Sequence, residues 1–238
     1  MFSGTDAFAR AAQGIANGLN AKMHDADRIP RAGGALFVGN HSFLGLDSYG
    51  LSALIITHTG RYPRFLGERN LWRVPGLRSV LDAVGAIPGV PEEAVKLLLE
   101  GELVGVYPGG INDSYKPSSE AYQLKWEGRS GFARVALRAR VPIVPIAATG
   151  VDEVFEIDRH EQWIGRTLLG SPKYDTPLPN SIVPKKVPFD YYVLPPIEPE
   201  GSPDDPEAVE RLRKATVDAM ESVLRPYRER IMRGRRIP

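Results

Sequence analysis

The sequence predicts a single α/β domain with a mixed, mostly parallel sheet flanked by helices. Short apolar runs bounded by glycine or proline, typical of buried strands, alternate along the chain with longer segments of helical periodicity. No internal repeat and no obvious linker interrupts this alternation. The length of 238 residues is sufficient for one medium-sized core. Strands that alternate with helices place the sheet between layers of helices.

The first 30 residues are expected to form an N-terminal helix and lead-in, and residues 31–238 to form the main domain with a basic C-terminal helix. A helix is predicted over residues 5–22 because apolar residues recur there at helical spacing. These residues are Phe8, Ala12, Ile15 and Leu19. The apolar stripe is thin, so this helix either docks on the domain or lies on a bilayer surface.

The first strand and helix of the main domain follow directly. The segment "GGALFVGN" at 33–40 is a short β-rich run between glycines, which predicts a buried strand. The segment "DSYGLSALIITHTG" predicts a helix from residue 47 onward, capped by Asp47 or Ser48. Gly60 ends this helix, because glycine readily adopts the left-handed conformation found at helix C-termini.

The next predicted elements are two further strands and two helices. The segment "RFLG" at 64–67 predicts a strand, and a helix follows that starts near Pro75 and ends at a glycine after residue 84. The segment "PEEAVKLLLEGE" opens with Pro91 and two glutamates, which suit the first turn of a helix. The segment "LVGVYPGG" then predicts a strand that ends in a turn.

The last third of the chain contains a helix, a strand and a long C-terminal helix. The segment "SGFARVALRARVPIVPIAATG" predicts a helix and then a strand, separated at a Val-Pro step. Residues 158–200 are rich in proline and tyrosine and show few periodic stretches before "FDYYVLPPI". A long helix is predicted from Pro206, capped by Asp205, with an interruption or kink near Pro226.

Composition excludes several classes of function. Lysine and arginine total 30 against 29 aspartate and glutamate, so no overall basic surface for nucleic acid is expected. Cysteine is absent, which excludes disulfides, thiolate nucleophiles and cysteine-ligated metals and fits a cytoplasmic location. No signal peptide is expected, and no run of about 18 apolar residues could span a bilayer.

Charge is concentrated at the C-terminus. Residues 211–238 contain nine basic and three acidic side chains. Such a surplus attracts anionic lipid head groups at roughly 1 kcal/mol per well-placed charge, which predicts peripheral association with a membrane surface. The alternative is a solvated helix end, where basic side chains suit the negative pole of the helix dipole.

The stretch "VGNHSFLGLDSYG" carries the first chemical signal. His41 ends a predicted buried strand, the position where ligands bind in such sheets, and Asp47 follows six residues later. On one continuous helix the two side chains would point roughly 120° apart, but Gly45 permits a turn with positive φ that returns the carboxylate to the ring. Asp47 could then fix the imidazole tautomer and leave the other nitrogen free as a general base. A hydrogen-bonded core histidine followed by a turn is the alternative.

The stretch "YPGGIND" at 107–113 carries the second signal. Two glycines at the end of a strand let backbone amides approach a ligand and can form an oxyanion-stabilising turn. A tight turn without a ligand is the alternative. Other chemistries lack their patterns: there is no G-x-S-x-G elbow, no zinc-ligand spacing around the histidines and no phosphate-binding glycine loop. No metal and no cofactor are therefore expected.

Three segments resemble blocks of the glycerolipid acyltransferase superfamily, which includes lysophospholipid and glycerol-3-phosphate acyltransferases. "HSFLGLD" after Gly-Asn resembles its histidine–aspartate block, and "FLGERNLWRVPGLRSVLDAVGAIPG" is similar to its second block. The segment from "LVGVYPGG" to "GVDE" resembles the Pro-Gly-Gly block and following strand of the diacylglycerol acyltransferase-like branch. The best match is the acyltransferase portion of plant phytyl ester synthases, and the blocks cover residues 35 to 155.

The resemblance implies a glycerol-3-phosphate acyltransferase-like fold and an O-acyltransferase. The expected donor is acyl-CoA or another acyl thioester, and the expected acceptor is a lipid alcohol at a membrane surface. The resemblance also implies that His41 is the catalytic base and Asp47 its partner. The residues it places around the substrates are Asn40, Ser42, Tyr107, Pro108, Gly109, Gly110 and Asp113.

Departures from the superfamily pattern bear on the acceptor. Five residues separate His41 from Asp47, where the superfamily has four. Phosphate-acceptor members carry glutamate and arginine where this chain has Gly109 and Asn112. Arginine binds phosphate bidentately, so its loss favours a neutral alcohol. Acyl transfer to a lysophospholipid or glycerol phosphate, and a lipid-binding protein without turnover, are the alternatives.

Overall fold

The structure, a computed structural model, describes residues 10, 13–14, 16–73, 77–83, 85–158, 179–181 and 183–235. Seven strands in this part of the chain form one sheet in the order β1-β7-β6-β2-β5-β3-β4. The strands are β1 (Lys22–His24), β2 (Ala35–Gly39), β3 (Pro63–Gly67), β4 (Ile87–Pro88), β5 (Leu103–Val106), β6 (Ile143–Thr149) and β7 (Asp190–Val193). The α-helices are α2 (Leu46–Thr59), α3 (Leu77–Ala83), α4 (Pro91–Leu99), α5 (Ile111–Ser114), α6 (Gly131–Ala139) and α8 (Pro206–Arg235). Short 3₁₀ helices are η1 (Ala26–Arg28), η2 (Phe43–Gly45), η3 (Arg69–Arg73) and η4 (Ser118–Glu120).

The sheet is mixed and mostly parallel, which confirms the predicted fold class. Strand β2 pairs in parallel with β5 and β6, and β3 pairs in parallel with β4 and β5. Strand β7 runs antiparallel to β6 and carries β1 parallel to itself. The C-terminal ends of β2 to β6 therefore meet at one edge of the sheet, here called the carboxyl edge. The opposite edge is called the amino edge.

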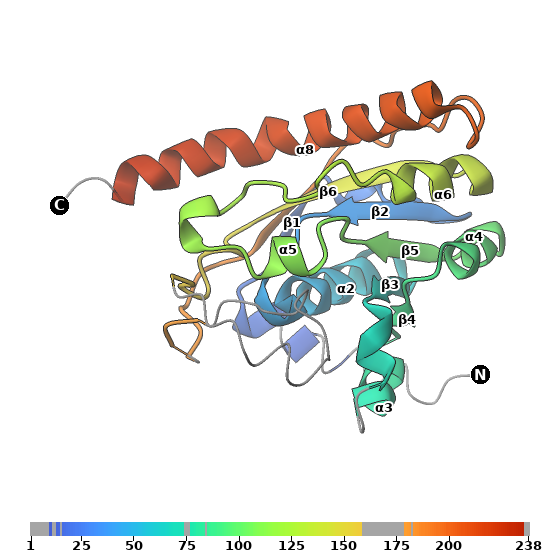
Figure 1. The fold of residues 1–238 in the computed structure, drawn as a ribbon. Coiled ribbons are helices and arrows are strands. Elements are labelled where there is room, and N and C mark those ends of the chain that lie inside the picture. The colour runs from blue at the N-terminus through green and yellow to red at the C-terminus, as the bar shows by residue number, and fades with distance from the viewer. Residues whose placement is uncertain are drawn as a thin grey trace.

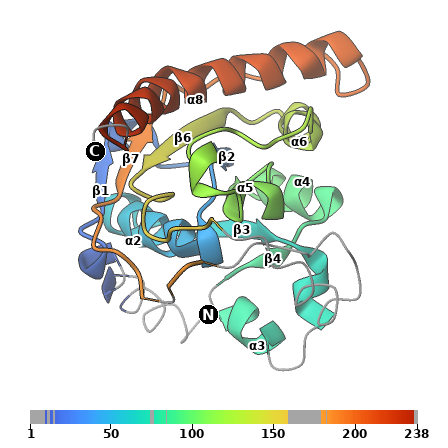
Figure 2. The same ribbon diagram turned by 60° about the vertical axis from the view of Figure 1, so that its left-hand side comes forward.

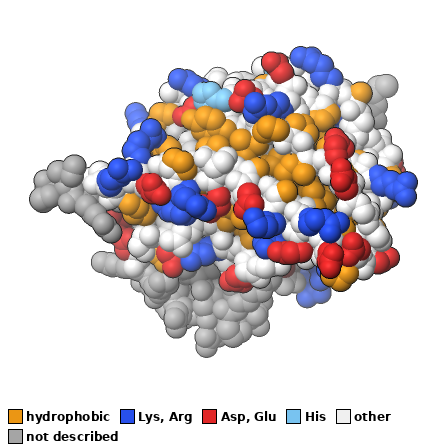
Figure 3. Space-filling model, turned by 90° about the horizontal axis from the view of Figure 1, so that it is seen from above, with side chains coloured by type: hydrophobic (Ala, Val, Ile, Leu, Met, Phe, Trp, Pro, Cys, Tyr) orange, Lys and Arg blue, Asp and Glu red, His pale blue; other side chains and the backbone are white. Residues whose placement is uncertain are grey.

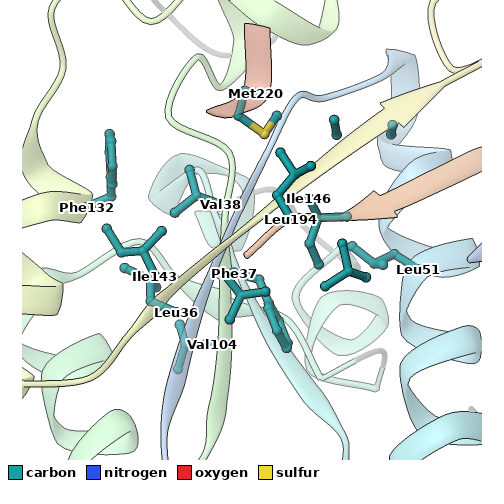
Figure 4. Close-up of a cluster of buried hydrophobic side chains, with 14 of the residues drawn as sticks. Leu36, Phe37, Val38, Leu51, Val104, Phe132, Ile143, Ile146, Leu194 and Met220 are labelled. Carbon is teal, nitrogen blue, oxygen red and sulfur yellow. The ribbon is translucent and has the colours of Figure 1, made fainter. Parts of the chain in front are cut away.

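Helices cover both faces of the sheet (Figures 1 and 2). Helix α2 lies on one face, and α4, α6 and α8 lie on the other, where α6 contacts both α4 and α8. Strands β2 and β6 are buried along their whole length, as parallel strands covered on both faces must be. Figure 4 shows the core that results, with Leu36, Val38 and Ile143 packed near Phe132 of α6 and Met220 of α8.

Most predicted elements agree with the structure, and the differences have local causes. Helix α2 ends at Gly60 with φ 71° as predicted, but its N-cap is Gly45 and neither Asp47 nor Ser48. Asp47 lies in the first turn because its carboxylate is bound by residues of the preceding loop. Strands β1 and β4 were not predicted, because two or three residues are too few to show a periodicity.

Helix α8 runs without a break through Pro226, so the predicted interruption is wrong, while the alternative, a kink at this residue, stays a prediction. Apolar side chains pack on the core on both sides of the proline: Met220 and Leu224 before it, and Tyr227 and Ile231 after it. This packing outweighs the one hydrogen bond that proline removes. The predicted cap is confirmed, since the Glu207 amide donates to the Asp205 carboxylate.

The predicted N-terminal helix, residues 5–22, is described in part, and residues 10, 13–14 and 16–18 are helical. Its predicted end at residue 22 is wrong, because Lys22 pairs with Asp190 in strand β1. Where it is described, Ala16 packs against Ala53 of α2, and Thr57 donates a hydrogen bond to Gln13. These contacts favour docking on the domain. Residues 159–178, within the predicted irregular region, also lie outside the described residues.

The basic residues of α8 do not form a uniform patch. Figure 3 looks down on the molecule from the side of α8 and shows acidic side chains beside basic ones across that surface. Six basic side chains pair with acidic residues of the same helix: Arg211 with Glu207, Arg213 with Glu210, Lys214 with Asp218, Arg225 and Arg228 with Glu221, and Arg233 with Glu229. Within the described residues, no helix combines the length and apolarity needed to cross a bilayer.

Candidate active site

The two segments singled out in the sequence meet at the carboxyl edge. His41 follows β2 after Asn40, and the Pro-Gly-Gly turn follows the neighbouring strand β5. The end of β6 lies on the other side of β2. Three adjacent strand ends thus build one site, as expected for a largely parallel sheet.

His41 and Asp47 form a hydrogen-bonded pair, with 3.1 Å between Nδ1 and Oδ2. The turn between them makes this possible, since Leu44 (φ 58°) and Gly45 (φ 69°) both adopt the left-handed conformation. Two consecutive left-handed residues reverse the chain and return Asp47 to the ring. The predicted turn at Gly45 is therefore confirmed, and five intervening residues are compatible with the contact.

Asp47 is buried, with 1% of its side chain exposed, and both oxygens of its carboxylate as well as its main-chain carbonyl accept hydrogen bonds. The Ser42 amide and hydroxyl both donate to Oδ1, and the Tyr191 hydroxyl donates to the Asp47 carbonyl at 2.8 Å. Burial alone would raise the pKa of Asp47. The charge of His41 and the hydrogen bonds from His41 and Ser42 outweigh burial, so the pKa lies below its ordinary value. The carboxylate is therefore ionised and fixes the imidazole orientation.

The opposite edge of the imidazole is open. The His41 side chain is 21% exposed, and Gly45 lies against the ring. A Cβ atom at Gly45 would lie 3.4 Å from Cε1 and 4.0 Å from Nε2 of His41. Such distances are ordinary van der Waals contacts, so it is the positive φ that requires glycine at this position.

Aromatic rings support the imidazole from one side. The Tyr107 ring stacks on His41 with centroids 4.1 Å apart and planes at 12°, and Phe65 stacks on the far side of Tyr107. Gly39 makes room, since a Cβ there would lie 3.2 Å from the Tyr107 ring. Burial, and then the nearby Asp47 carboxylate, raise the pKa of Tyr107 well above its ordinary value. Its hydroxyl is therefore protonated at neutral pH.

The backbone of His41 is held by a buried charge network. Asp113, which is fully buried, accepts a hydrogen bond of 3.1 Å from the His41 amide. Lys116 lies 3.1 Å from the Asp113 carboxylate and 3.0 Å from that of Asp152. Burial alone would lower the pKa of Lys116, but the two carboxylates raise it, so the ammonium stays charged. The network connects the turns after β2, β5 and β6.

Asn40 extends the pairing between β2 and β6. Its side-chain amide donates to the Ala148 carbonyl at 3.0 Å and accepts from the Ala148 amide at 2.8 Å. Asn40 and Ser42 are both buried, and both bind protein groups on either side of His41. Each of these residues, predicted at the substrates, contributes to the support of the histidine.

The Pro-Gly-Gly turn is shaped by what lies below and beside it. A Cβ at Gly109 would lie 2.3 Å from the Cβ of Asp113, so only glycine fits above that carboxylate. Arg129 donates to the carbonyls of Pro108 and Gly109 at 2.9 and 2.8 Å. The Gly110 amide donates to the Tyr107 carbonyl at 3.0 Å and is used within the turn.

A cavity of about 430 Å³ opens beside this turn. Its volume is typical of small-molecule sites, which range from about 300 to 1,000 Å³. Tyr107, Pro108 and Gly110 line it together with apolar side chains of the core, among them Leu36, Leu66, Val106, Phe132 and Val135. Arg69 and Arg129 add two positive charges to the lining, and Glu68 adds a negative one. The cavity thus combines an apolar wall with a charged rim, next to the ring that supports His41.

Four residues at this edge were not predicted from the sequence: Lys116, Arg129, Asp152 and Tyr191. Lys116 has one local partner, Asp113, but its other partner, Asp152, and the groups that Arg129 and Tyr191 bind are distant along the chain. No local motif marks these four residues. Among the described residues, no three histidine, aspartate or glutamate side chains converge on a point that could hold a metal ion.

Comparison with known proteins gives the family and the fold class of this chain. The family model "Acyltransferase" matches residues 20–149, more than half of the chain. A solved structure of the 1-acyl-sn-glycerophosphate (LPA) acyltransferase PlsC from Thermotoga maritima has the same fold, with a TM-score of 0.54 at 15% identity. The likeness covers 94% of this chain and 84% of that one. The α/β domain is therefore an acyltransferase fold.

Other relatives have a higher sequence identity to this chain than the PlsC structure does. The "DGAT1/2-independent enzyme synthesizing storage lipids" is 35% identical in Bos taurus and 34% in Homo sapiens, each over 134 residues, or 56% of this chain. An uncharacterized protein of Mycobacterium tuberculosis is 30% identical over 165 residues, or 67% of this chain. The match covers 40% of the bovine, 41% of the human and 46% of the mycobacterial protein, so this chain spans less than half of each. The chain belongs to the glycerolipid acyltransferase superfamily.

Proposed function

We propose that this chain transfers a fatty acyl group from an acyl thioester, acyl-CoA, to the hydroxyl of a neutral lipid alcohol. The observation that carries the proposal is the His41–Asp47 pair at the carboxyl edge, with Nε2 open and a cavity beside the supporting tyrosine. The family match supports the reaction class. The name of the bovine and human relatives, which refers to storage lipids, supports a neutral acceptor.

In the proposed mechanism, His41 Nε2 removes the proton of the acceptor hydroxyl while the oxygen attacks the thioester carbonyl carbon. Asp47 stabilises the imidazolium that forms, and its bond to Nδ1 keeps Nε2 unprotonated beforehand. The tetrahedral intermediate then expels the thiolate, the C–S bond breaks, and the imidazolium returns its proton to sulfur. The products are an ester and a free thiol.

The Pro-Gly-Gly turn supplies the electrostatic part of the proposal. The Gly110 amide donates to the Tyr107 carbonyl, whereas the Gly109 amide donates to no carbonyl of the turn, and in this proposal it donates to the developing oxyanion. Arg129 fixes the two carbonyls of the same turn and so orients that amide. In this proposal Asp113, Asn40 and Ser42 position His41 and do not touch substrate.

The test is the purified His41→Ala variant with unchanged circular dichroism, assayed with labelled acyl-CoA and diacylglycerol. We expect the rate of acyl transfer to fall by about 10²- to 10⁴-fold, because a positioned general base contributes that much. An undiminished rate of acyl transfer would exclude His41 as the general base and so contradict this mechanism. Tight lipid retention by the wild type, without thioester cleavage on any acceptor, would instead indicate a lipid-binding protein.

A second candidate function is transfer to a phosphorylated acceptor, and one observation favours it. Arg69 and Arg129 line the cavity, although the arginine positions of phosphate-acceptor relatives are not arginine here. The two guanidinium groups could hold the phosphates of CoA or a phosphate of the acceptor. In an Arg69→Gln variant, the first function predicts a higher KM for acyl-CoA alone. The second predicts a higher KM for glycerol phosphate or lysophosphatidate.

A further inference from the structure

Leu44 is an exposed apolar residue in a strained conformation, next to the proposed base. Its side chain is 61% exposed, and its backbone adopts φ 58° and ψ 8°. This left-handed region is sterically unfavourable for a residue with a Cβ atom, and glycine or asparagine adopts it at lower cost. Leu44 therefore combines two unfavourable features, an exposed apolar side chain and a strained backbone.

The fold does not use the Leu44 side chain. Phe43 and Leu46, on either side in the turn, pack on the hydrophobic core, whereas Leu44 is absent from the residues that pack there. Phe43 makes edge-to-face contacts with Tyr115 and Phe155, which anchor the turn. Leu44 is thus held outward by its neighbours. The left-handed backbone at Leu44 serves the turn that returns Asp47 to His41, but glycine or asparagine would serve it at lower cost, and the leucine side chain does not pack on the core. An apolar side chain kept at such a position points to a contact with something outside the protein.

The position of the turn restricts what that contact can be. Gly45, the next residue, lies against Cε1 and Nε2 of His41, so Leu44 stands beside the open edge of the ring. A protein partner or a second copy seated on Leu44 would cover that edge and exclude the acceptor. Whatever covers Leu44 during turnover must bring the acceptor hydroxyl with it. A lipid surface that contains the acceptor meets this condition.

We propose that Leu44 inserts among the acyl chains of the lipid surface from which the acceptor is drawn. This inference rests on the proposed function and adds to it the residue that contacts the lipid. The left-handed turn presents Leu44 outward while Gly45 leaves Nε2 clear, so the acceptor hydroxyl reaches the imidazole as the leucine enters the lipid. The additional residue between His41 and Asp47 is accommodated in this same turn.

The test compares Leu44→Glu with a matched control, Leu99→Glu. Leu99 is 68% exposed at the end of α4, on the amino edge, away from His41. Each variant is assayed with one acyl-CoA and two acceptors, a long-chain diacylglycerol in phosphatidylcholine vesicles and a short-chain diacylglycerol dissolved as monomer. We expect Leu44→Glu to lower the ratio of vesicle rate to monomer rate by roughly tenfold or more, from the lost burial of one leucine side chain. Leu99→Glu should keep the wild-type ratio.

A second variant separates a lipid contact from a structural role. Leu44→Asn should also lower the ratio, while its thermal unfolding midpoint stays equal to or above that of the wild type, because asparagine relieves the strain. An unchanged ratio in both Leu44 variants would overturn the inference. Equal losses on both acceptors, or a lower unfolding midpoint for Leu44→Asn, would show a structural role and also overturn it.

Vesicle binding without substrate keeps this inference separate from the proposed function. Co-sedimentation with phosphatidylcholine vesicles that contain diacylglycerol should weaken in Leu44→Glu and not in Leu99→Glu. A wild type that transfers no acyl group in any assay refutes the proposed function. In that case the co-sedimentation pair decides alone whether Leu44 contacts lipid, and equal binding by both variants refutes the contact.

Discussion

Two histidine–aspartate pairs in this chain make similar contacts, and each histidine stacks on a tyrosine, although Asp47 binds Nδ1 of its histidine and Asp190 binds Nε2. His41 pairs with Asp47 at 3.1 Å and stacks on Tyr107 at 4.1 Å. His24 pairs with Asp190 at 2.7 Å and stacks on Tyr192 at 4.6 Å, between strands β1 and β7. Judged by these contacts alone, either pair could hold a general base.

The surroundings separate the two pairs. Asp47 is 1% exposed and Asp190 is 31% exposed, so water screens the second pair and hardly reaches the first. The His41 pair lies at the carboxyl edge, above the buried network of Asp113, Lys116 and Asp152, and the Tyr107 ring that stacks on His41 lines a cavity. A pair becomes a candidate active site through burial of its carboxylate, support of its backbone and space for a ligand. The contact between the two side chains is not enough.

The largest difference is expected when each aspartate is changed to asparagine. Asp47→Asn should lower the rate of acyl transfer by about 10²-fold or more, since the imidazole loses its charge partner and its fixed tautomer. Asp190→Asn should leave the rate within about twofold, because an exposed pair contributes little. Steady-state rates of the two purified variants check this. Equal losses of rate in the two variants would mean that Asp47 has no role in acyl transfer that Asp190 lacks.

The buried network under His41 should have a smaller but still large effect on stability. In Lys116→Met two carboxylates are left buried without their cation, which should lower the free energy of unfolding by about 3–5 kcal/mol. The control is Lys185→Met, which breaks an exposed pair with Glu156 and should cost less than about 1 kcal/mol. Urea unfolding at neutral pH measures both. A loss of unfolding free energy in Lys116→Met as small as that in Lys185→Met would mean that the buried network does not stabilise the carboxyl edge of the sheet.

The pH dependence of stability should give the smallest effect. The folded pKa of Asp47 lies below its ordinary value of 3.8, so Asp47 stabilises the protein above that pH. This stabilisation is lost as the pH falls through the folded pKa. The stability gap between wild type and Asp47→Asn should therefore be wider at pH 7 than at pH 3, as urea midpoints will show. A constant gap would mean that the carboxylate is not stabilised as an anion.

Sequence reasoning succeeded where the information is local. The strand, turn and helix around His41 lie within about 25 consecutive residues, and glycine positions fix the turn and the helix end. The fold class followed from the alternation of apolar runs with helical segments. The short strands β1 and β4 could not be predicted from the sequence, because they are strands through their pairing with neighbouring strands and not through their own residue pattern.

The support of the site was missed because it is formed by the topology. Lys116 and Asp152 are 36 residues apart and meet only because β5 and β6 flank β2. Arg129 reaches the Pro-Gly-Gly turn from the loop before α6, so the loss of arginine from the motif positions did not show that arginine is absent from the cavity. The catalytic roles predicted for His41 and Asp47, the predicted substrate contacts and the division at residue 30 stay predictions.

The close approach of Gly109 to Asp113 has a consequence for how this loop can change. Both positions compete for one small volume, since a Cβ at the first would lie 2.3 Å from the Cβ of the second. A relative that places a carboxylate at the first position must therefore carry a smaller side chain at the second. Such a loop can carry its carboxylate at the position of Gly109 or at that of Asp113. A change from one arrangement to the other requires substitutions at both positions.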